Sequence, residues 1–293
     1  MPLLVGTKER SFMTESPSPR NKSLAIVAGN GEFPTMVAEG ARRQGYSPII
    51  ILAQRGHASQ SLQAKADGCF WVHVGQIGKM LAILKREKIS NLVLAGGINR
   101  KQLKLKLDFG GIRFFWGLRN KGDDALLKHL AQFFEARNVT VLDGSKFMQN
   151  SLAPTGCIAG RLPSEREQKD IALGFKVAKA LGSVDVGQSV TVHNGMVVGV
   201  EALEGTDALI LRSGEITGLA DKHPQSNGLI LVKVAKPQQD LRLDRPTIGV
   251  ETIFALSHAG GTVLAIEAGV TMILNPAEVL SACEKTGVSI VGV

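Results

Sequence analysis

Residues 24–34 read Leu-Ala-Ile-Val-Ala-Gly-Asn-Gly-Glu-Phe-Pro, an apolar run followed by a glycine-rich turn and a proline. An uninterrupted short apolar run is typical of a parallel strand that is covered on both faces. Pro34 suits the first turn of a helix, where an N–H group has no partner. Residues 35–44 continue as that helix. A strand, a tight turn and a helix in this order predict the first unit of an α/β fold.

The same alternation continues through the first half of the chain. We predict strands over 47–52, 69–74, 91–95 and 139–142, and helices over 77–87 and 124–136. Alternating strands and helices indicate a parallel sheet with right-handed crossovers. The prediction is a Rossmann-like nucleotide-binding domain over residues 23–150. Before it, residues 1–22 are rich in Ser, Pro and Thr and are predicted to be a disordered extension.

The second half has a different order of elements. Ser164 and Glu167 form a capping-box pattern at the start of a helix over 164–181. Asn194-Gly195 is a hairpin signal within residues 188–203. Further strands are predicted over 228–235, 263–274 and 288–293, and helices over 250–258 and 277–286. Residues 164–293 therefore read as a C-terminal mixed α/β domain, which a linker over 151–163 joins to the first.

The net charge of +8 is concentrated in one region of the chain. Residues 100–121 hold seven basic side chains against a single aspartate. Phe, Trp and Leu side chains alternate with these charges, which suits an anionic membrane surface. In the alternative interpretation, the aromatic side chains belong to the protein core and the charged side chains form a solvated rim around it. Nucleic acid is disfavoured as a partner because the patch is too apolar and no nucleic-acid motif accompanies it.

Several classes of protein are excluded by composition. The three cysteines are far apart and odd in number, which predicts neither a disulfide framework nor a zinc site and suits a reducing cytoplasm. No apolar run approaches the roughly 18 residues that a membrane span needs. The six histidines show no metal-binding spacing, and no Walker A, G-x-S-x-G or kinase motif is present.

Two glycine-rich turns follow predicted strands. Gly29 and Gly31 follow the first strand, and Gly96 and Gly97, with Asn99 close behind, follow a later one. Because ligands of open parallel sheets sit at the carboxyl ends of strands, these turns indicate a nucleotide crevice. A proline replaces the third glycine of the dinucleotide fingerprint, so NAD is only weakly supported. In the alternative interpretation, the glycines are present only because the turns need positive φ values, and no ligand binds there.

Charged side chains in two further segments suit phosphate or a cation. Lys121 has no evident structural task and could face phosphate, whereas Asp123 and Asp124 suit the start of a helix. Two prolines bracket the stretch 236–249, which presents Asp240 and Asp244 together with Arg242.

A Mg²⁺ site needs only one or two protein carboxylates. We expect Asp244 to act with a carboxylate from the stretch 201–207, which offers three: Glu201, Glu204 and Asp207. A charged surface loop is the alternative interpretation of the stretch 236–249.

Taken together, these stretches resemble a known family. The chain is similar to the LpxI-type UDP-2,3-diacylglucosamine pyrophosphatases of Gram-negative lipid A synthesis. The similarity runs in order through residues 26–34, 78–79, 95–100, 121–127, 185–188, 201–208 and 244–249. It implies a two-domain enzyme in which Mg²⁺-dependent attack of water on the α-phosphorus releases UMP and 2,3-diacylglucosamine 1-phosphate. Arg245 departs from the leucine expected after the essential aspartate.

The resemblance also assigns site residues. The essential aspartate falls on Asp244, which is expected to hold the metal. Expected catalytic partners are Glu201 and Glu204, and the general base stays open among these two and Asp240. The expected substrate-binding residues are Gly29, Gly31, Gly78, Lys79, Gly96, Gly97, Asn99, Lys121, Asp123, Asp124, Gln188, Thr206 and Asp207.

The expected partners are UDP-2,3-diacylglucosamine and the anionic inner-membrane surface. The protein is expected to be cytoplasmic and peripherally attached to that membrane, and a homo-oligomer is left open.

Two other functions fit the same residues less fully. One is a nucleotide-sugar oxidoreductase that uses the glycine-rich domain. The other is a carrier of lipid or nucleotide without catalytic activity.

Overall fold

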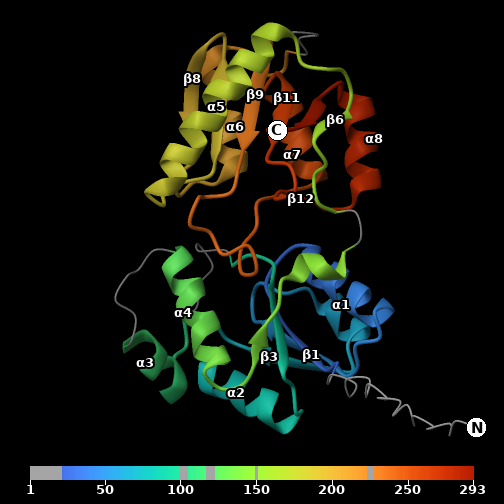
Figure 1. Cartoon of the computed structure of the whole chain (residues 1–293), viewed down its shortest axis with the longest axis vertical. Helices are drawn as coiled ribbons and strands as arrows, with labels where there is room; N and C mark the ends of the chain where they lie inside the picture. Colours follow the sequence, from blue (N-terminus) through green and yellow to red (C-terminus); the bar gives the residue numbers. More distant parts are fainter. Residues whose placement is uncertain (1–21, 99–104, 117–122, 149–150, 223–226) are drawn as a thin grey trace, which may run out of the picture.

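The chain folds around two sheets, one built by each half of the sequence. This computed structural model describes residues 22–98, 105–116, 123–148, 151–222 and 227–293. Figure 1 shows the two sheets in two lobes that are stacked along the long axis of the molecule. We refer to residues 22–148 as the N-terminal lobe and to residues 151–293 as the C-terminal lobe.

The N-terminal lobe contains the parallel sheet that the sequence predicts. Its five strands all run in the same direction, and their order is β3-β2-β1-β4-β5. The direction in which strands are added reverses between β1 and β4, which is the switch point of the sheet. The strands are β1 (Leu24–Ala28), β2 (Ile49–Gln54), β3 (Gly68–Val72), β4 (Asn91–Ala95) and β5 (Thr140–Val141).

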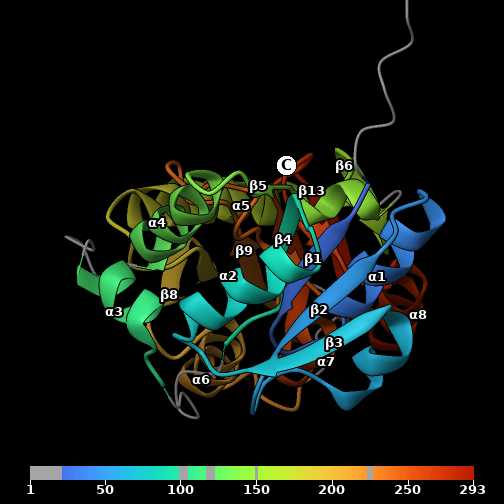
Figure 2. The ribbon, with the colours of Figure 1, turned by 90° about the horizontal axis from the view of Figure 1, so that it is seen from below.

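Helices cover both faces of this sheet (Figure 2). Leu24 and Ile26 of β1 pack into the core on one face, and Ala25 packs into the core on the other. This double burial explains why the strand is apolar throughout. The first face is covered by α1 (Phe33–Arg43) and the short helices η1 (Gln60–Lys65) and η3 (Gly144–Phe147). The second is covered by α2 (Ile77–Arg86), α3 (Phe109–Trp116) and α4 (Asp123–Glu135).

The C-terminal lobe has a mixed sheet of six strands covered by helices, which confirms the predicted mixed α/β class. The order is β6-β13-β11-β9-β7-β8, in which β9, β11 and β13 are parallel and the other three pair antiparallel. The strands are β6 (Gly156–Ala159), β7 (Ser189–His193), β8 (Met196–Val200), β9 (Leu229–Lys233), β11 (Gly261–Ile266) and β13 (Ser289–Gly292). A separate two-stranded sheet joins β10 (Thr247–Ile248) to β12 (Met272–Ile273).

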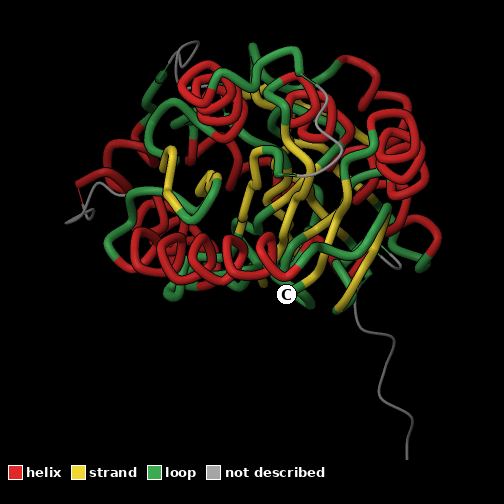
Figure 3. The backbone as a smooth tube through the Cα atoms, turned by 90° about the horizontal axis from the view of Figure 1, so that it is seen from above, coloured by secondary structure: helices red, strands yellow, loops and turns green. Residues whose placement is uncertain are grey.

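Helices also enclose the second sheet, as the tube in Figure 3 shows. One face packs against α5 (Glu165–Ser183), whose Ile171 and Ala178 are buried against the strands. The other face packs against α6 (Thr206–Thr217), α7 (Val250–His258) and α8 (Pro276–Thr286). Pro276 starts α8, where a proline is well tolerated. Asn194 and Gly195 take the positive φ values of a tight hairpin between β7 and β8, which confirms the predicted hairpin.

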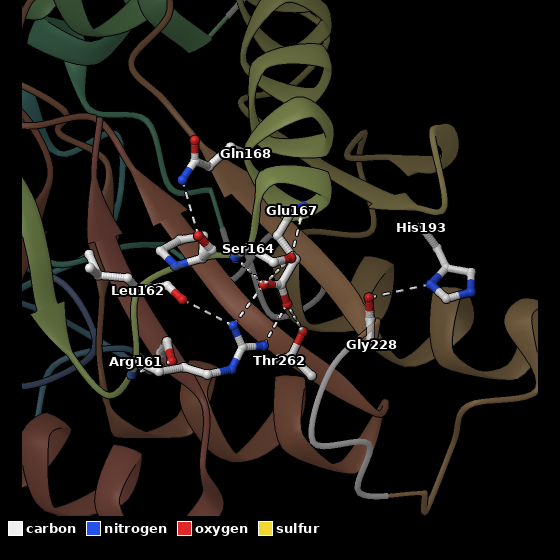
Figure 4. Close-up of polar contacts among 10 residues, drawn as sticks. Arg161, Leu162, Ser164, Glu167, Gln168, His193, Gly228 and Thr262 are labelled. Atoms are coloured by element: carbon white, nitrogen blue, oxygen red, sulfur yellow. Dashed lines mark hydrogen bonds and ion pairs between the residues drawn. The ribbon is translucent and has the colours of Figure 1, made fainter.

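An ion pair between the partly exposed Arg161 and the buried Glu167 anchors the start of α5 (Figure 4). The predicted capping box is confirmed, because Ser164 accepts from the Glu167 backbone and Glu167 accepts from the Ser164 backbone. Arg161 donates two hydrogen bonds of 2.7 Å to the Glu167 carboxylate, and Thr262 adds another at 3.1 Å. Burial alone would raise the pKa of Glu167, but the arginine and Ser164 outweigh it and lower the pKa to about 2.

Several segments differ from the sequence-based prediction. The stretch 151–163, predicted as a linker, contains β6, which pairs antiparallel with β13 at the edge of the second sheet. Two helices, α3 and α6, were not predicted. Nearly all of the predicted disordered extension, residues 1–21, lies outside the described residues. Within the described ranges, no helix combines the length and the apolar character needed to cross a bilayer.

Candidate functional site

A loop from the C-terminal lobe reaches across to the N-terminal lobe. Residues 236–246, which we call the crossing loop, descend from the upper lobe to the lower one (Figure 1). Leu243 is buried in the core that α2 and α4 form on the first sheet. Arg242 pairs with Glu135 of α4 at 2.9 Å. The crossing loop is therefore fixed to the N-terminal lobe by both apolar burial and charge.

Arg245 ties the same loop to both lobes. Its guanidinium donates to Asp143, which follows β5 in the N-terminal lobe, at 2.8 Å. It also donates to the backbone oxygen of Val270 in the C-terminal lobe at 2.8 Å. This side chain is nearly buried, with 10% of its surface exposed. The residue that departs from the resembled family thus has a defined structural task here.

Asp244 lies between these two arginines, at the junction of the lobes. Its side chain is exposed, and Oδ2 accepts one hydrogen bond of 2.8 Å from Gln239. Oδ1 accepts no hydrogen bond from the part of the chain that the structure describes. Asp240, by contrast, is bound by Arg242, whose hydrogen bonds lower the pKa of that carboxyl. Asp244 is therefore the crossing-loop carboxylate that retains an oxygen for an incoming group.

A buried polar cluster lies in the C-terminal lobe beside the end of this loop. Glu201 is 8% exposed, and its carboxylate accepts from Thr206 Oγ1 at 2.8 Å and from the Gln188 amide at 3.2 Å. Lys233 Nζ donates to Thr206 Oγ1 at 3.2 Å and to the backbone oxygen of Thr247 at 2.9 Å. Three of the residues singled out in the sequence are thus brought together, and Lys233 joins them.

The other acidic residues of this segment do not join the cluster. Glu204 pairs with Arg212 of α6 at 2.9 Å, and Asp207 is an exposed residue in the first turn of that helix. A hydrogen bond to its own backbone, and then the Arg212 guanidinium, lower the pKa of Glu204. Among the described residues, no group of three or more His, Cys, Asp or Glu side chains could hold a metal. In the part of the chain that the structure describes, Asp244 alone would therefore offer a free carboxylate oxygen to a metal at this place.

The two glycine-rich turns lie against each other at the switch point of the first sheet. The Gly29 amide donates to Ala95 O at 2.8 Å, and the Asn30 amide donates to Gly97 O at 2.9 Å. A Cβ on Gly29 would collide with Gly97 O, and one on Gly96 with Asn30 O. These glycines are therefore required by the close approach of the two backbones. Gly31 has a φ of 81° and open space around it.

At the start of α2, a side chain of the protein itself occupies the backbone donors. The amides of Gly78 and Lys79 donate to the Asp108 carboxylate at 3.0 and 2.8 Å. Asp108 also caps α3 through the Gly111 amide at 2.7 Å. Burial opposes ionisation, but these backbone hydrogen bonds prevail and lower the pKa of Asp108. The backbone amides of Gly78 and Lys79, two of the expected substrate-binding residues, thus help to hold α2 and α3 together through Asp108.

The side chains of the four remaining candidates lie outside the described part of the structure. Asn99 and Lys121 lie outside the described residues. Asp123 and Asp124 form the first turn of α4, and their side chains are likewise outside the described part.

Comparison with known families covers both lobes. Residues 23–151 match the LpxI N-terminal domain, and residues 154–291 match the LpxI C-terminal domain. The chain belongs to the LpxI family. The UDP-2,3-diacylglucosamine pyrophosphatase LpxI of Caulobacter vibrioides is 29% identical over 276 residues, which span 93% of this chain and 98% of that protein. The two matched ranges coincide with the two lobes of this LpxI family member.

Among solved structures, the N5-carboxyaminoimidazole synthetase of Staphylococcus aureus matches 71% of this chain and 52% of its own. The identity is 10% and the TM-score is 0.24, a similarity too low to bear on the fold or function of this LpxI family member.

Proposed function

We propose that this chain hydrolyses the pyrophosphate bond of UDP-2,3-diacylglucosamine. Water would attack the α-phosphorus and release UMP and 2,3-diacylglucosamine 1-phosphate, in lipid A synthesis. The activity named for the Caulobacter relative supports this, as does membership of the same family over both lobes. The observation that carries the proposal is the exposed carboxylate of Asp244 on a loop fixed to both lobes.

We propose that residues 23–150 and 164–293 are separate domains and that the substrate binds between them. The carboxyl ends of the parallel strands face the crossing loop, because Arg242 and Arg245 contact Val141 and Asp143 at the end of β5. The switch point between β1 and β4 lies on that same edge. A nucleotide is the ligand class that such an edge binds in open α/β sheets.

We propose Mg²⁺ as the cofactor, with Asp244 as its protein ligand. A single carboxylate is sufficient because Mg²⁺ commonly takes its other ligands from water and substrate phosphates. The Oδ1 atom of Asp244 has no partner in the described chain, so the donor fits this ion. When bound, a divalent ion supplies charge neutralisation at phosphate and lowers the pKa of an attacking water.

The residues around Asp244 would hold its carboxylate in place. Gln239 donates to Oδ2 and restricts the side chain, while Arg245 fixes the following residue to both lobes. Of the three candidate bases, Asp240 and Glu204 are each neutralised by an arginine. Glu201 accepts hydrogen bonds from the Thr206 hydroxyl and from the backbone amide of Gln188, neither of which is charged. We therefore retain Glu201 as the candidate base.

The direct test is incubation of the purified protein with UDP-2,3-diacylglucosamine, with and without a chelator. We expect UMP to appear and the chelator to abolish its release, with activity restored by added Mg²⁺. Substrate that is bound but left intact would support a carrier instead. Tight NAD(P) binding in a fluorescence titration, without UMP release, would support the oxidoreductase.

We also propose that α3 attaches the protein to the anionic surface of the inner membrane, from its cytoplasmic side. Phe109 is 83% exposed and Trp116 is 89% exposed, and with Ile112 they follow the spacing of one helix face. Lys106 and Arg113 are exposed beside them, while Phe114 is buried in the core. An apolar helix face bordered by basic residues is typical of helices that lie in a membrane interface.

Replacing Phe109 and Trp116 together with serine is expected to weaken binding to anionic phospholipid vesicles at least ~10-fold, because both apolar side chains leave the interface. Cosedimentation with vesicles measures this. Leu162 and Leu203 are 73% and 85% exposed in the other lobe, so their double serine variant is the matched control. Equal vesicle binding by both variants would contradict the proposal.

A further inference from the structure

A polar cavity lies at the carboxyl ends of β2 and β3. Its volume is about 430 Å³, within the roughly 300–1,000 Å³ typical of small-molecule sites. Its lining comprises Arg55, Gly56, Gln60, Gln63 and Trp71. No function considered so far uses it.

The topology places this cavity on the same edge as the glycine-rich turns. Arg55 is the first residue after β2. Trp71, the next-to-last residue of β3, pairs with Ala53, the next-to-last residue of β2. Strand β2 is also the direct neighbour of β1, which ends at the first glycine-rich turn. Because all five strands are parallel, the cavity faces the side on which the crossing loop lies.

Three polar side chains that line the cavity have no partner among the described residues. The side chains of Arg55, Gln60 and Gln63 make no hydrogen bond or ion pair with any part that the structure describes. Gln60 and Gln63 are three residues apart on η1, a spacing that puts side chains of a 3₁₀ helix on the same side. Gly56 has a φ of 82°, and a Cβ there would meet open space.

These groups have a specific chemistry in common. Amide side chains can donate to and accept from the edge of a heterocycle. The partly exposed indole of Trp71 offers a face for stacking on a base. Arg55 is the charged residue among the described residues of the lining, and its guanidinium favours an anion such as phosphate. An acyl chain would leave these polar groups unsatisfied, so the lining does not suit the lipid half of a substrate.

We propose that this cavity binds the uridine monophosphate half of the substrate, with Trp71 against the base and Arg55 toward the phosphate. The inference rests on the proposed function for the identity of the nucleotide. Nucleosides of open α/β sheets extend from the switch point beyond the end of the neighbouring strand, which is the position of this cavity.

The test uses the product UMP and the fluorescence of Trp71. The chain has only two tryptophans, so a Trp116→Phe variant leaves Trp71 as the single indole. We expect UMP to change its emission saturably. Adding Arg55→Ala is expected to weaken UMP binding at least ~10-fold, while binding of uridine, which has no phosphate, changes less than ~2-fold. Arg43 at the end of α1 is exposed and has no hydrogen-bond or ion-pair partner in the described ranges, so Arg43→Ala is the matched control.

Two results would overturn the proposal. One is UMP binding, seen by calorimetry, that leaves Trp71 emission unchanged. The other is Arg55→Ala that binds UMP as tightly as Arg43→Ala, with far-ultraviolet dichroism showing both folded. Hydrolysis of UDP-2,3-diacylglucosamine by the unmodified chain is measured in parallel. If the unmodified chain hydrolyses the substrate and either of these two results is found, only the proposed UMP site is rejected. If the unmodified chain does not hydrolyse the substrate, the proposed function is rejected.

Discussion

Replacing Asp244 with alanine is expected to slow hydrolysis of UDP-2,3-diacylglucosamine at least ~100-fold while substrate binding persists. Such a loss corresponds to about 2.7 kcal/mol of barrier lowering. The reason is the position of the side chain. It is exposed on the crossing loop, with one oxygen free of hydrogen bonds from the described chain. Removing it takes away the proposed metal ligand without disturbing the buried Leu243.

Steady-state kinetics with wild type and variant measure the change, and equilibrium binding of substrate is measured separately. Asp221→Asn is the control, because Asp221 is an exposed aspartate in a turn of the C-terminal lobe with a φ of 55°, a conformation that asparagine tolerates. The control should keep wild-type rates. Asp244→Ala with undiminished turnover would remove this residue from the reaction and would leave the crossing loop with a structural role only.

Much of the fold could be predicted because its signals are local. The apolar run of β1 and its turn identify a covered parallel strand, and the capping box of α5 and the hairpin turn at Asn194 are each contained in a few consecutive residues. Asp244 belongs to this group as well. A proline-bracketed charged loop and a resembled motif pointed to it, and the structure places it at the junction of the lobes.

The missed elements depend on contacts between distant residues. Gly110 and Gly111 argue against a helix by propensity, yet they let α3 pack closely on Gly75 and Gly78. Strand β6 exists because β13, about 130 residues later, offers it a pairing edge.

Two polar residues were also missed, because their contacts are made with residues distant in the sequence. Lys233 ends an apolar strand, and its partners Thr206 and Thr247 are 27 and 14 residues away. Asp108 lay inside the basic patch, and only the folded chain shows that it caps α2.

Replacing Glu167 with glutamine is expected to lower the free energy of unfolding by about 3 kcal/mol at pH 7, the linkage value for a carboxyl whose pKa falls from 4.5 to about 2. Because the folded pKa is depressed, this stabilisation is present above about pH 4.5 and is lost as the pH falls toward 2. At pH 3 roughly half of it should remain. The physical source is the bidentate Arg161 pair together with the bonds from Ser164 and Thr262.

Urea unfolding of wild type and Glu167→Gln at pH 7 and pH 3 measures both the loss and its pH dependence. Glu165→Gln is the matched control, since Glu165 is an exposed carboxylate in the same first turn of α5. Its variant should change the free energy of unfolding by less than about 0.5 kcal/mol, as surface substitutions usually do. A gap between wild type and Glu167→Gln that stays constant from pH 7 to pH 3 would contradict the argument. The cost would then come from lost packing and hydrogen-bond geometry, because a contribution from the ionised carboxylate must shrink as that group takes up a proton.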